Sequence, residues 1–557
     1  MDLETAGMRA AVVVAALVAL LAVVLLERAR GDGEGVGDVL RRRFVLGVPW
    51  GTLTTVAVVL AVYLHVQGGL THWYAPVTLP FYAWTYLEPL GMLFAGLAHG
   101  GPGHLLGNLV GTLVLAPLAE FAFGHFAARR GESTFGSRRR NPYVRAFVLF
   151  PAAAVGVAVL TALFSLGPVI GFSGVVFAFA GAALVYYPLA TVVALAGARV
   201  LNLTYQVLRQ PVVQASGRPS YVTPWWADIA VQGHAFGLLV GVLLAAGLAA
   251  RRGDSLPRPR RLLLGTLLFG VAQSLWAVYW YRGGESYVLY RAVGLALVVL
   301  LGVLVATLAV GERRTLRVGS VREFLATLTP RNAAVVCLLV VLAAIAGPAI
   351  PVNLNAVDDE PLPGDPVEVR GYSVTYAEDV RNGMVSIVDV EAFGETTNVT
   401  TSGVVVRNPD RGVWTTATTK GRLAFAGRST VVVGGVGWRD TVTAVREGYE
   451  TVGGDAAYRV TLRHDGDERV AYTSPAATAE PRLGGRNVSV KPTEEEFLLV
   501  VTRGNETAEV SVPGENETAT AGGLAFVRDG RAVIAVTDGN ETRVRVANRE
   551  TYDGRRG

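Results

Sequence analysis

The sequence predicts a polytopic α-helical membrane protein with a C-terminal all-β domain outside the cytoplasm. Of its 557 residues, 51% are hydrophobic and only 17% are charged, which is a low share for a soluble chain. The apolar residues lie mostly before residue 350, in runs near the ~20 residues that a membrane helix requires. The charge changes at the same place: residues 1–350 carry 27 Lys and Arg against 14 Asp and Glu, and residues 351–557 carry 23 against 31.

Ten apolar runs are candidate membrane helices. They span residues 8–27, 46–67, 99–120, 145–165, 171–187, 189–208, 230–250, 262–281, 287–310 and 332–350. Basic residues collect in short cytoplasmic loops, and four basic clusters occur, at 28–43, 129–145, 251–261 and 313–331. An even number of runs separates successive clusters, so all four fit on the cytoplasmic side. The N-terminus and the tail after residue 350 then face out of the cytoplasm.

The first run has two interpretations, a membrane helix or a cleaved signal peptide. Asp2 and Glu4 precede it, its apolar core is long, and no small-residue cleavage site follows. We therefore expect an uncleaved helix. The single cysteine, Cys337, lies in the last apolar run, so a disulfide within one chain is excluded.

The tail begins with an expected proline-rich linker over 351–370, which carries Pro361, Pro363 and Pro366 among acidic residues. From 371 to 557, turn-forming residues separate many short β-prone runs, a pattern typical of a sandwich or barrel. These runs include 404–406, 429–433, 458–462, 497–501, 532–536 and 543–546. No group of residues in the tail has the pattern of a catalytic site.

Five Asn-X-Ser/Thr tripeptides occur in the tail, and such tripeptides accept N-linked glycans when they face outward. The asparagines are Asn398, Asn487, Asn505, Asn516 and Asn540. A threonine-rich segment also produces these tripeptides by chance. Their agreement with the predicted topology supports an outward-facing tail and leaves glycosylation open.

A serine between two glycines, in Gly171-Phe172-Ser173-Gly174, is the first candidate for chemistry. It is either a packing residue that bonds its own backbone or a nucleophile, which needs a base and donors for the developing oxyanion. Histidines inside membrane helices are functional candidates because polar groups are costly there. His104 and Asn108 lie one helical turn apart, and His234 lies near the start of another run.

The predicted topology puts these groups at one depth. The runs that hold His104, Ser173 and His234 all enter from outside, so each residue falls within the first turns of its helix. Two stripes of small residues, which allow close helix contact, favour an approach of the last two runs. The stripes are Gly174, Ala178 and Ala182 on one run, and Gly233, Gly237 and Gly241 on the other.

In these residues the chain resembles the rhomboid intramembrane serine proteases over roughly 46–250, a core of six helices. The matching pattern is a His-X-X-X-Asn helix, a Gly-X-Ser-Gly helix, and a histidine helix with glycines three and seven residues later. It is carried here by His104 and Asn108, by Gly171 to Gly174, and by His234 with Gly237 and Gly241. His99 and Glu120 also stand at family positions, whereas Phe177 stands where many members have a tyrosine that stacks on the base.

The resemblance implies an endopeptidase that cleaves transmembrane segments with a dyad of Ser173 as nucleophile and His234 as general base and acid. His104, Asn108 and the backbone amide of Ser173 would hold the oxyanion. Gly171 would leave room for substrate. Gly174, Gly237, Gly241, His99, Glu120 and Phe177 would give structural support. The expected partners are membrane protein substrates and the lipid bilayer. We expect neither a cofactor nor nucleic-acid binding.

Outside the expected core lie an extra helix and basic loop over 1–45, three more helices over 251–350, and the tail. Small-residue stripes pack equally well within one chain or between two, so the oligomeric state stays open.

Other membrane proteases are disfavoured. Gly35-Val36-Gly37-Asp38 has the letters of an aspartyl-protease motif, but it lies in a polar loop, and His-Glu-X-X-His is absent, so we expect no metal. The alternatives are a catalytically silent rhomboid-like protein that binds transmembrane segments and an adhesion or sensor protein that acts through its β domain.

Overall fold

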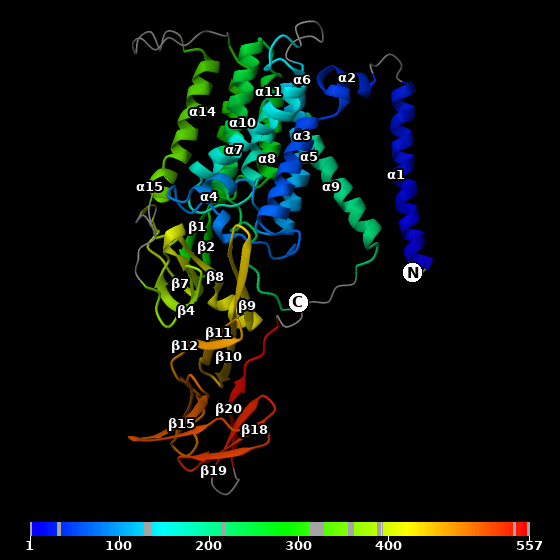
Figure 1. Ribbon diagram of the computed structural model, residues 1–557. Helices are drawn as coiled ribbons and strands as arrows, with labels where there is room; N and C mark the ends of the chain where they lie inside the picture. Colours follow the sequence, from blue (N-terminus) through cyan, green and yellow to red (C-terminus); the bar gives the residue numbers. More distant parts are fainter. Residues whose placement is uncertain are drawn as a thin grey trace. The chain divides into compact units, whose positions relative to one another are not determined.

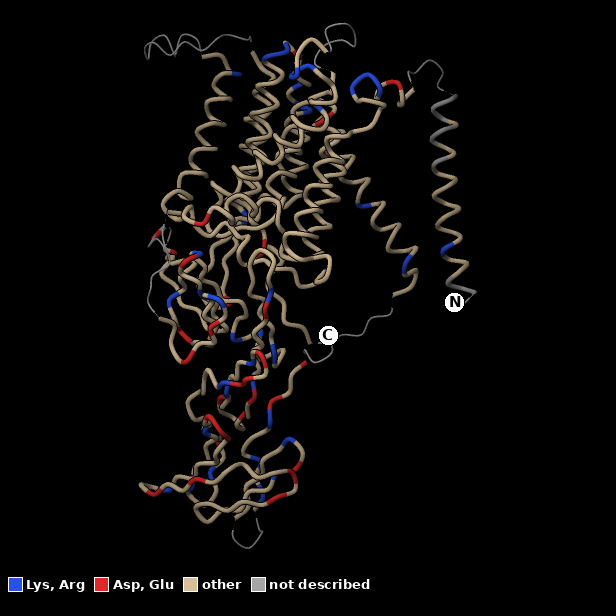
Figure 2. Tube along the Cα trace, viewed as in Figure 1, with Lys and Arg blue, Asp and Glu red and all other residues tan. Residues whose placement is uncertain are grey.

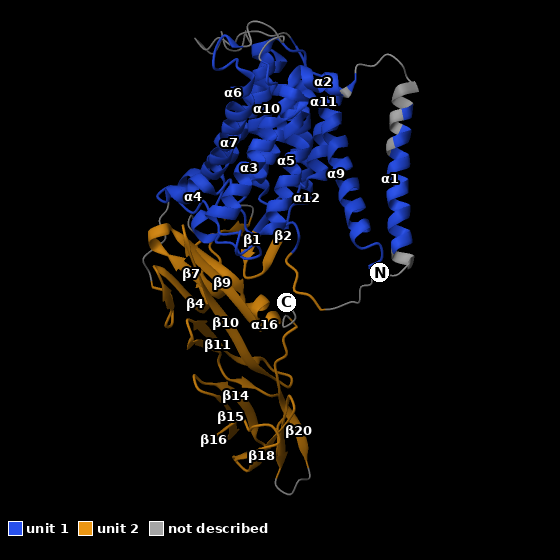
Figure 3. Cartoon of the chain, turned by 45° about the vertical axis from the view of Figure 1, so that its right-hand side comes forward, with its two compact units in different colours: residues 1–218, 224–280, 288–355 blue, residues 219–223, 281–287, 356–557 orange. Residues whose placement is uncertain are grey.

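The computed structural model describes residues 3–29, 35–126, 135–213, 219–311, 328–354, 361–386, 391–392, 394–537 and 542–553. The chain divides into two compact units (Figure 3). The helical unit comprises residues 1–218, 224–280 and 288–355, and the β unit comprises residues 219–223, 281–287 and 356–557. Two short segments that lie between helices of the helical unit, residues 219–223 and 281–287, therefore belong to the β unit.

The helical unit consists mostly of apolar helices, many of which pack as a bundle (Figure 1). Its helices are α1 (Leu3–Ala29), α2 (Val36–Arg43), η1 (Val45–Gly47), α3 (Trp50–Ala61), η2 (Val62–Val66), η3 (Leu79–Phe81), α4 (Pro89–Phe94), α5 (Pro102–Phe123), α6 (Pro142–Val144), η5 (Arg145–Leu149), α7 (Phe150–Phe164), α8 (Ser173–Tyr186), α9 (Pro188–Arg209), α10 (Val231–Arg252), α11 (Pro259–Ala272), α12 (Arg291–Thr307), α14 (Pro330–Ala346) and α15 (Ala349–Leu354). Proline begins α5, α9, α11 and α14, at the helical position where its missing N–H costs no hydrogen bond.

In the described part of the chain, five helical spans are long and apolar enough to cross a membrane. They are Pro102–Phe123, Pro142–Phe164, Pro188–Arg209, Val231–Arg252 and Pro330–Leu354. Shorter apolar helices lie at Ala6–Ala19, Trp50–Val66, Ser173–Tyr186 and Arg291–Thr307. Together with the β-rich C-terminal half, these helices confirm the predicted fold class. The number of crossings and the location of the β domain outside the cytoplasm stay predictions.

The runs expected at 262–281 and 287–310 were both too long. Helix α11 ends at Ala272, and a hairpin of β1 (Tyr279–Gly283) and β2 (Ser286–Leu289) precedes α12. Gly283 and Gly284 at its turn both have positive φ, at 92° and 57°. Glycine accepts this conformation without strain, and aromatic residues favour the flanking strands. The mean hydropathy of a run of about 20 residues does not reveal such a local preference for a turn and two strands.

Basic side chains from separate parts of the sequence converge at the C-terminal end of α5. Arg145 donates to the carbonyl oxygens of Phe123 and Gly124, and Arg252 donates to those of Ala122 and Phe123. Cations are favourable at the negative end of a helix dipole. Figure 2 shows Lys and Arg gathered at the end of the helical unit where α2 and α6 lie. One end of the helical unit is therefore basic.

Helices α8 and α10 are in close contact. A Cβ on Gly237 would collide with the backbone of Gly174, and a Cβ on Gly241 would collide with the backbone of Ala178. Gly181 of α8 approaches the backbone of Leu238 in the same way. Any larger side chain at these three glycines would push the two helices apart, so the spacing between α8 and α10 depends on them.

The β unit is built mainly from antiparallel strands. Its elements are β3 (Val367–Val369), β4 (Tyr372–Arg381), β5 (Glu391–Ala392), β6 (Glu395–Thr396), β7 (Thr400–Asn408), η6 (Pro409–Arg411), β8 (Val413–Thr419), α16 (Lys420–Ala426), β9 (Arg428–Gly435), β10 (Trp438–Thr451), β11 (Ala456–His464), β12 (Asp467–Thr473), β13 (Ala477–Thr478), β14 (Asn487–Pro492), β15 (Phe497–Arg503), β16 (Glu506–Ser511), β17 (Thr518–Ala521), β18 (Leu524–Asp529), β19 (Ala532–Thr537) and β20 (Arg543–Arg549). Parts of the expected linker, 351–370, are regular structure, since it overlaps α15 and β3.

Three sheets carry most of the β unit. One has the order β3-β4-β7-β8, a second β13-β14-β15-β16, and the largest runs β12-β11-β10-β20-β19-β18-β17 with β9 also paired to β10. The long strand β10 pairs with β9 through residues 438–445 and with β20 through residues 449–451. It therefore pairs with β9 along its first part and with β20 at its last residues. The alternating burial along β10 fits a sheet with one buried face.

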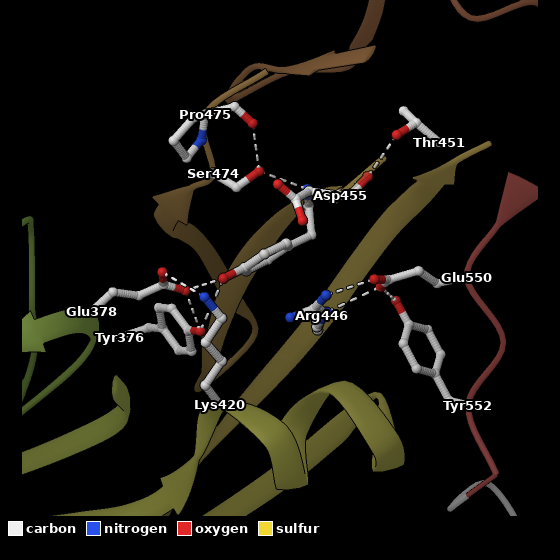
Figure 4. Close-up of polar contacts among 11 residues, drawn as sticks. Tyr376, Glu378, Lys420, Arg446, Thr451, Asp455, Ser474, Pro475, Glu550 and Tyr552 are labelled. Atoms are coloured by element: carbon white, nitrogen blue, oxygen red, sulfur yellow. Dashed lines mark hydrogen bonds and ion pairs between the residues drawn. The ribbon is translucent and has the colours of Figure 1, made fainter. Parts of the chain in front are cut away.

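A polar network lies inside the β unit (Figure 4). Glu378 accepts hydrogen bonds from Lys420 Nζ at 2.8 Å, from Tyr376 Oη at 2.8 Å and from Tyr458 Oη. Burial alone would raise the pKa of Glu378, but these three donors lower it overall. Arg446 lies over the Tyr458 ring and forms two hydrogen bonds with Glu550. The network joins β4, α16, β10, β11 and the end of the chain.

Candidate active site

Ser173 and His234 are in hydrogen-bond contact. Ser173 is the first residue of α8, and His234 lies in the first turn of α10. The distance from His234 Nε2 to Ser173 Oγ is 2.9 Å. The close contact of α8 with α10 sets this distance, because Gly237 lies one turn after His234 and meets the backbone of Gly174.

The imidazole of His234 is held by stacking. The Phe177 ring lies 4.2 Å from it, centroid to centroid, with an angle of 8° between the planes. Phe177 itself meets Phe269 of α11 edge to face at 5.6 Å. Within the described residues, Nδ1 of His234 has no protein hydrogen-bond partner. The ring orientation is therefore set by an aromatic neighbour and by the bond to Ser173.

Sequence reasoning missed Gln232, which fixes the start of α10. Its Nε2 donates to the carbonyl oxygens of Phe164 and Ile345, each at 2.8 Å, and its Oε1 accepts from the backbone N–H of Leu166. Three connections from one side chain tie α10 to the end of α7 and to α14. The signal that the sequence offered for Gln232 was its position, since it is a polar residue two places before the candidate base.

His104 lies against the loop that leads into Ser173. A Cβ on Gly171 would collide with the His104 ring. Gly171 also has a φ of 124°, which strongly favours glycine, and its N–H donates to Ala95 O at 2.8 Å. This glycine is therefore required both by backbone conformation and by the neighbouring imidazole. Gly174 has a different neighbour, since its Cβ would meet Thr161 of α7.

Asn108 and His99 form a pair beside His104. Asn108 Nδ2 lies 3.0 Å from His99 Nε2, and the His99 and His104 rings meet edge to face at 5.1 Å. Gln67, a second residue missed in the sequence, accepts from the His99 N–H and donates to the His99 carbonyl oxygen. His104, Asn108 and His99 thus form one polar group at the start of α5.

Glu120 is distant in the chain from this group, near the opposite end of α5. The carboxylate is fully buried and accepts from the N–H groups of Gly51 and Thr52, from Thr52 Oγ1, and from His125 Nε2 at 2.5 Å. His125 Nδ1 accepts from the Val45 N–H, so the proton lies on Nε2. Glu120 caps the N-terminus of α3 and makes no contact with the reacting groups.

The starts of α5, α8 and α10 thus bring together the Ser173 hydroxyl, the His234 imidazole and the His104 ring, which lies against Gly171. The amide of Asn108 is paired with His99 instead. A hydroxyl bonded to a neutral imidazole can lose its proton to it as it attacks an electrophile. The N–H of Ser173, at the first position of α8, has no acceptor within the helix and so can donate to an anion. This arrangement can perform acyl transfer.

The expected glycan acceptors lie in varied surroundings. Asn398, Asn505 and Asn516 are exposed, and Asn487 is half-buried at the start of β14. Asn540 lies outside the described residues.

Among the described residues, one group has the composition of a metal site: Asp440, His464 and Asp465, in the β unit. His464 Nε2 already lies 3.2 Å from Asp440 Oδ2, and the positive charge of Arg370 acts on the same carboxylate. Both features oppose cation binding, and we assign no metal to this group.

Comparison with protein families identifies the domain. Residues 84–251 match the model of the rhomboid domain, a segment that contains His104, Ser173 and His234. The match begins after α3, so it does not include the expected first core helix. The comparisons with curated proteins and with solved structures gave no significant match.

Proposed function

Because residues 84–251 form a rhomboid domain, we propose that this protein is an intramembrane serine endopeptidase that cleaves transmembrane segments of membrane proteins. The observation that carries the proposal is the 2.9 Å contact between His234 Nε2 and Ser173 Oγ. A rhomboid domain without catalysis has no need of a hydroxyl and a base at this distance.

In the proposed reaction, Ser173 Oγ attacks the carbonyl carbon of the scissile peptide bond while its proton passes to His234 Nε2. The negative charge on the carbonyl oxygen is held by the side chains of His104 and Asn108 and by the Ser173 N–H. His234 then gives the proton to the leaving amine as the C–N bond breaks. A water molecule, deprotonated by His234, hydrolyses the acyl-enzyme and frees Ser173.

We propose that the active site opens toward the outer side of the membrane. The convergence of Arg145 and Arg252 at the far end of α5 supports this orientation, since basic residues prefer the cytoplasmic side. His104 lies in the first turn of the same helix, which puts about 20 residues, or about 30 Å, between the two ends. With the ten crossings predicted from the sequence, the β unit and the N-terminus would also be extracytoplasmic.

Cleavage of a tagged single-span substrate tests the proposal. Wild-type protein, Ser173→Ala and His234→Ala are reconstituted with a panel of substrates that includes helix-destabilised spans. We expect cleavage by wild type only, with a loss of at least about 1,000-fold in each variant. A fluorophosphonate probe should label wild type and leave both variants unlabelled.

Cleavage by Ser173→Ala at the wild-type rate would exclude this serine as the nucleophile. A wild-type protein that binds the substrates, cleaves none of them and takes up no probe would instead support the silent, span-binding alternative.

A further inference from the structure

The end of α7 is held by side chains from two other segments of the helical unit. A helix leaves its last carbonyl oxygens without partners of its own, and α7 ends at Phe164, with Ser165 as the next residue. Phe164 O accepts from Gln232 Nε2 of α10 at 2.8 Å. Ser165 O accepts from Asn353 Nδ2 of α15 at 3.1 Å. The last turn of α7 is therefore tied to both α10 and α15.

Asn353 also joins this point to the segment that precedes α4. The residue is fully buried. Its backbone oxygen accepts from the Tyr86 N–H at 2.8 Å and from Thr85 Oγ1 at 3.0 Å. Tyr86 Oη in turn donates to Leu163 O of α7 at 2.5 Å. Asn353 is thus built into the helical unit beside α7, although it lies well after residue 251, where the match with the rhomboid domain ends.

The start of α10 depends on contacts with other helices. Its N-cap residue, Ala230, has no side-chain oxygen that could accept from the free N–H groups of the first turn. Gln232 supplies the missing support. Besides its bond to α7, its Nε2 donates to Ile345 O near the end of α14 at 2.8 Å, and its Oε1 accepts from the Leu166 N–H at 3.1 Å. The first turn of α10 is therefore held by α14 and by the end of α7.

The candidate base lies in this same turn. His234 comes two residues after Gln232, and Gly233 between them packs against the end of α7, since an added Cβ would lie 3.2 Å from Ser165 Oγ. Helix ends are the parts of a helix that open most easily. Without the Gln232 bonds the first turn of α10 would fray, and the 2.9 Å distance from His234 Nε2 to Ser173 Oγ would no longer be fixed.

We propose that Gln232 and Asn353 are positioning residues for His234, so that α14 and α15 are required for efficient proteolysis. The inference rests on the proposed protease function. All the contacts that carry it lie within the helical unit. It extends the working protease beyond residues 84–251, the segment that matches the rhomboid domain.

Kinetic comparison of Gln232→Met and Asn353→Leu with wild type tests the inference. Methionine is unbranched and close to glutamine in length, and leucine is close to asparagine in size, so each change removes hydrogen bonds with little change in volume. We expect Gln232→Met to lower kcat for substrate cleavage and the rate at which a fluorophosphonate probe labels Ser173 by about tenfold. Asn353→Leu acts one contact further away and should lower both by about threefold. KM should stay unchanged in each variant, because a misplaced base slows the reaction without weakening substrate binding.

Gln206→Met is the matched control. It makes the same change at an exposed residue near the end of α9, and both rates should stay at the wild-type value. Thermal unfolding of each purified full-length protein establishes that it is folded, and rates are compared per folded molecule. If Gln232→Met fails to fold, Asn353→Leu decides. Failure of both to fold would overturn the inference, because the contacts would then serve folding as a whole.

Wild-type rates in either folded variant would overturn the inference and leave the proposed protease function intact. A raised KM at unchanged kcat would also overturn it, because the residues would then act on substrate binding. Equal slowing in Gln206→Met would do the same, since the effect would not be specific to these contacts. Absence of both cleavage and probe labelling in wild type would instead count against the protease function itself.

Discussion

At the scale of the residue, the groups that orient the imidazole of His234 differ from those in a Ser-His-Asp triad. In a triad a carboxylate orients the imidazole and stabilises its charged form. Here the ring is stacked on Phe177, and within the described residues its Nδ1 has no protein partner. An aromatic face favours a nearby cation without burying a second charge. This suits a membrane interior, where an extra carboxylate would be costly.

Replacement of Phe177 by leucine should therefore lower kcat. The stacked pair is worth about 1 kcal/mol beyond its apolar area, which corresponds to about fivefold in rate. Phe179→Leu is the control: Phe179 lies two residues further along α8, and its ring contacts those of Phe150 at 5.5 Å and Phe172 at 6.4 Å, not the ring of His234. Turnover per folded molecule should fall for Phe177→Leu and stay at the wild-type value for Phe179→Leu. Equal kcat in the two variants would contradict a role of the stack in catalysis.

Residues at the site differ in whether a sequence motif predicts them. Gly171 stands out in the sequence, and its φ of 124° and its contact with His104 explain why glycine is needed. Gln67 and Gln232 carry no motif. They were missed because their partners are backbone atoms far away in the sequence, which only the folded chain brings close.

At the scale of the element, the α8-α10 contact determines whether a catalytic pair exists. Gly237 and Gly241 of α10 face backbone atoms of Gly174 and Ala178, so the two helix backbones touch without side chains between them. A hydrogen bond between the first turns of two helices is sensitive to their separation, because a shift of about 1 Å already weakens it strongly.

Gly241→Ala should separate the helices and reduce both stability and activity. Its Cβ would collide with backbone atoms of Ala178, and such overpacking costs about 1 to 3 kcal/mol. Gly247→Ala is a matched control on the same helix, since no atom lies within 4 Å of its added Cβ. The temperature of thermal unfolding and the rate at which Ser173 is labelled should fall for Gly241→Ala and stay unchanged for Gly247→Ala. A fall of the same size for Gly247→Ala would mean that the α8 contact is not the cause.

At the scale of the whole molecule, charge separates the two ends of the helical unit. Arg145 and Arg252 lie more than one hundred positions apart in the sequence and bond the same carbonyl oxygen, that of Phe123. The reacting groups lie in the first turns of their helices. The proposed orientation follows from this polarity and from the preference of basic residues for the cytoplasmic side.

Cysteine labelling in intact cells checks the orientation. In a Cys337→Ser background, Asn505→Cys in the β unit should react with a membrane-impermeant maleimide. Arg139→Cys should react only after the membrane is permeabilised. Both positions are exposed in the structure, so access to the thiol is limited only by the membrane. Labelling of Arg139→Cys alone in intact cells would reverse the proposed topology.

The sequence alone determined the membrane character of the first half, the β-rich second half and the candidates Ser173, His234, His104 and Asn108. Hydropathy, charge and short motifs are local properties, and local properties are visible in a linear chain. Only the tertiary structure decided the 2.9 Å contact of Ser173 with His234, the Phe177 stack, the Gln232 connections and the place of residues 219–223 in the β unit. Each of these depends on contacts between residues distant in sequence, and such contacts exist only once the helices and sheets have packed.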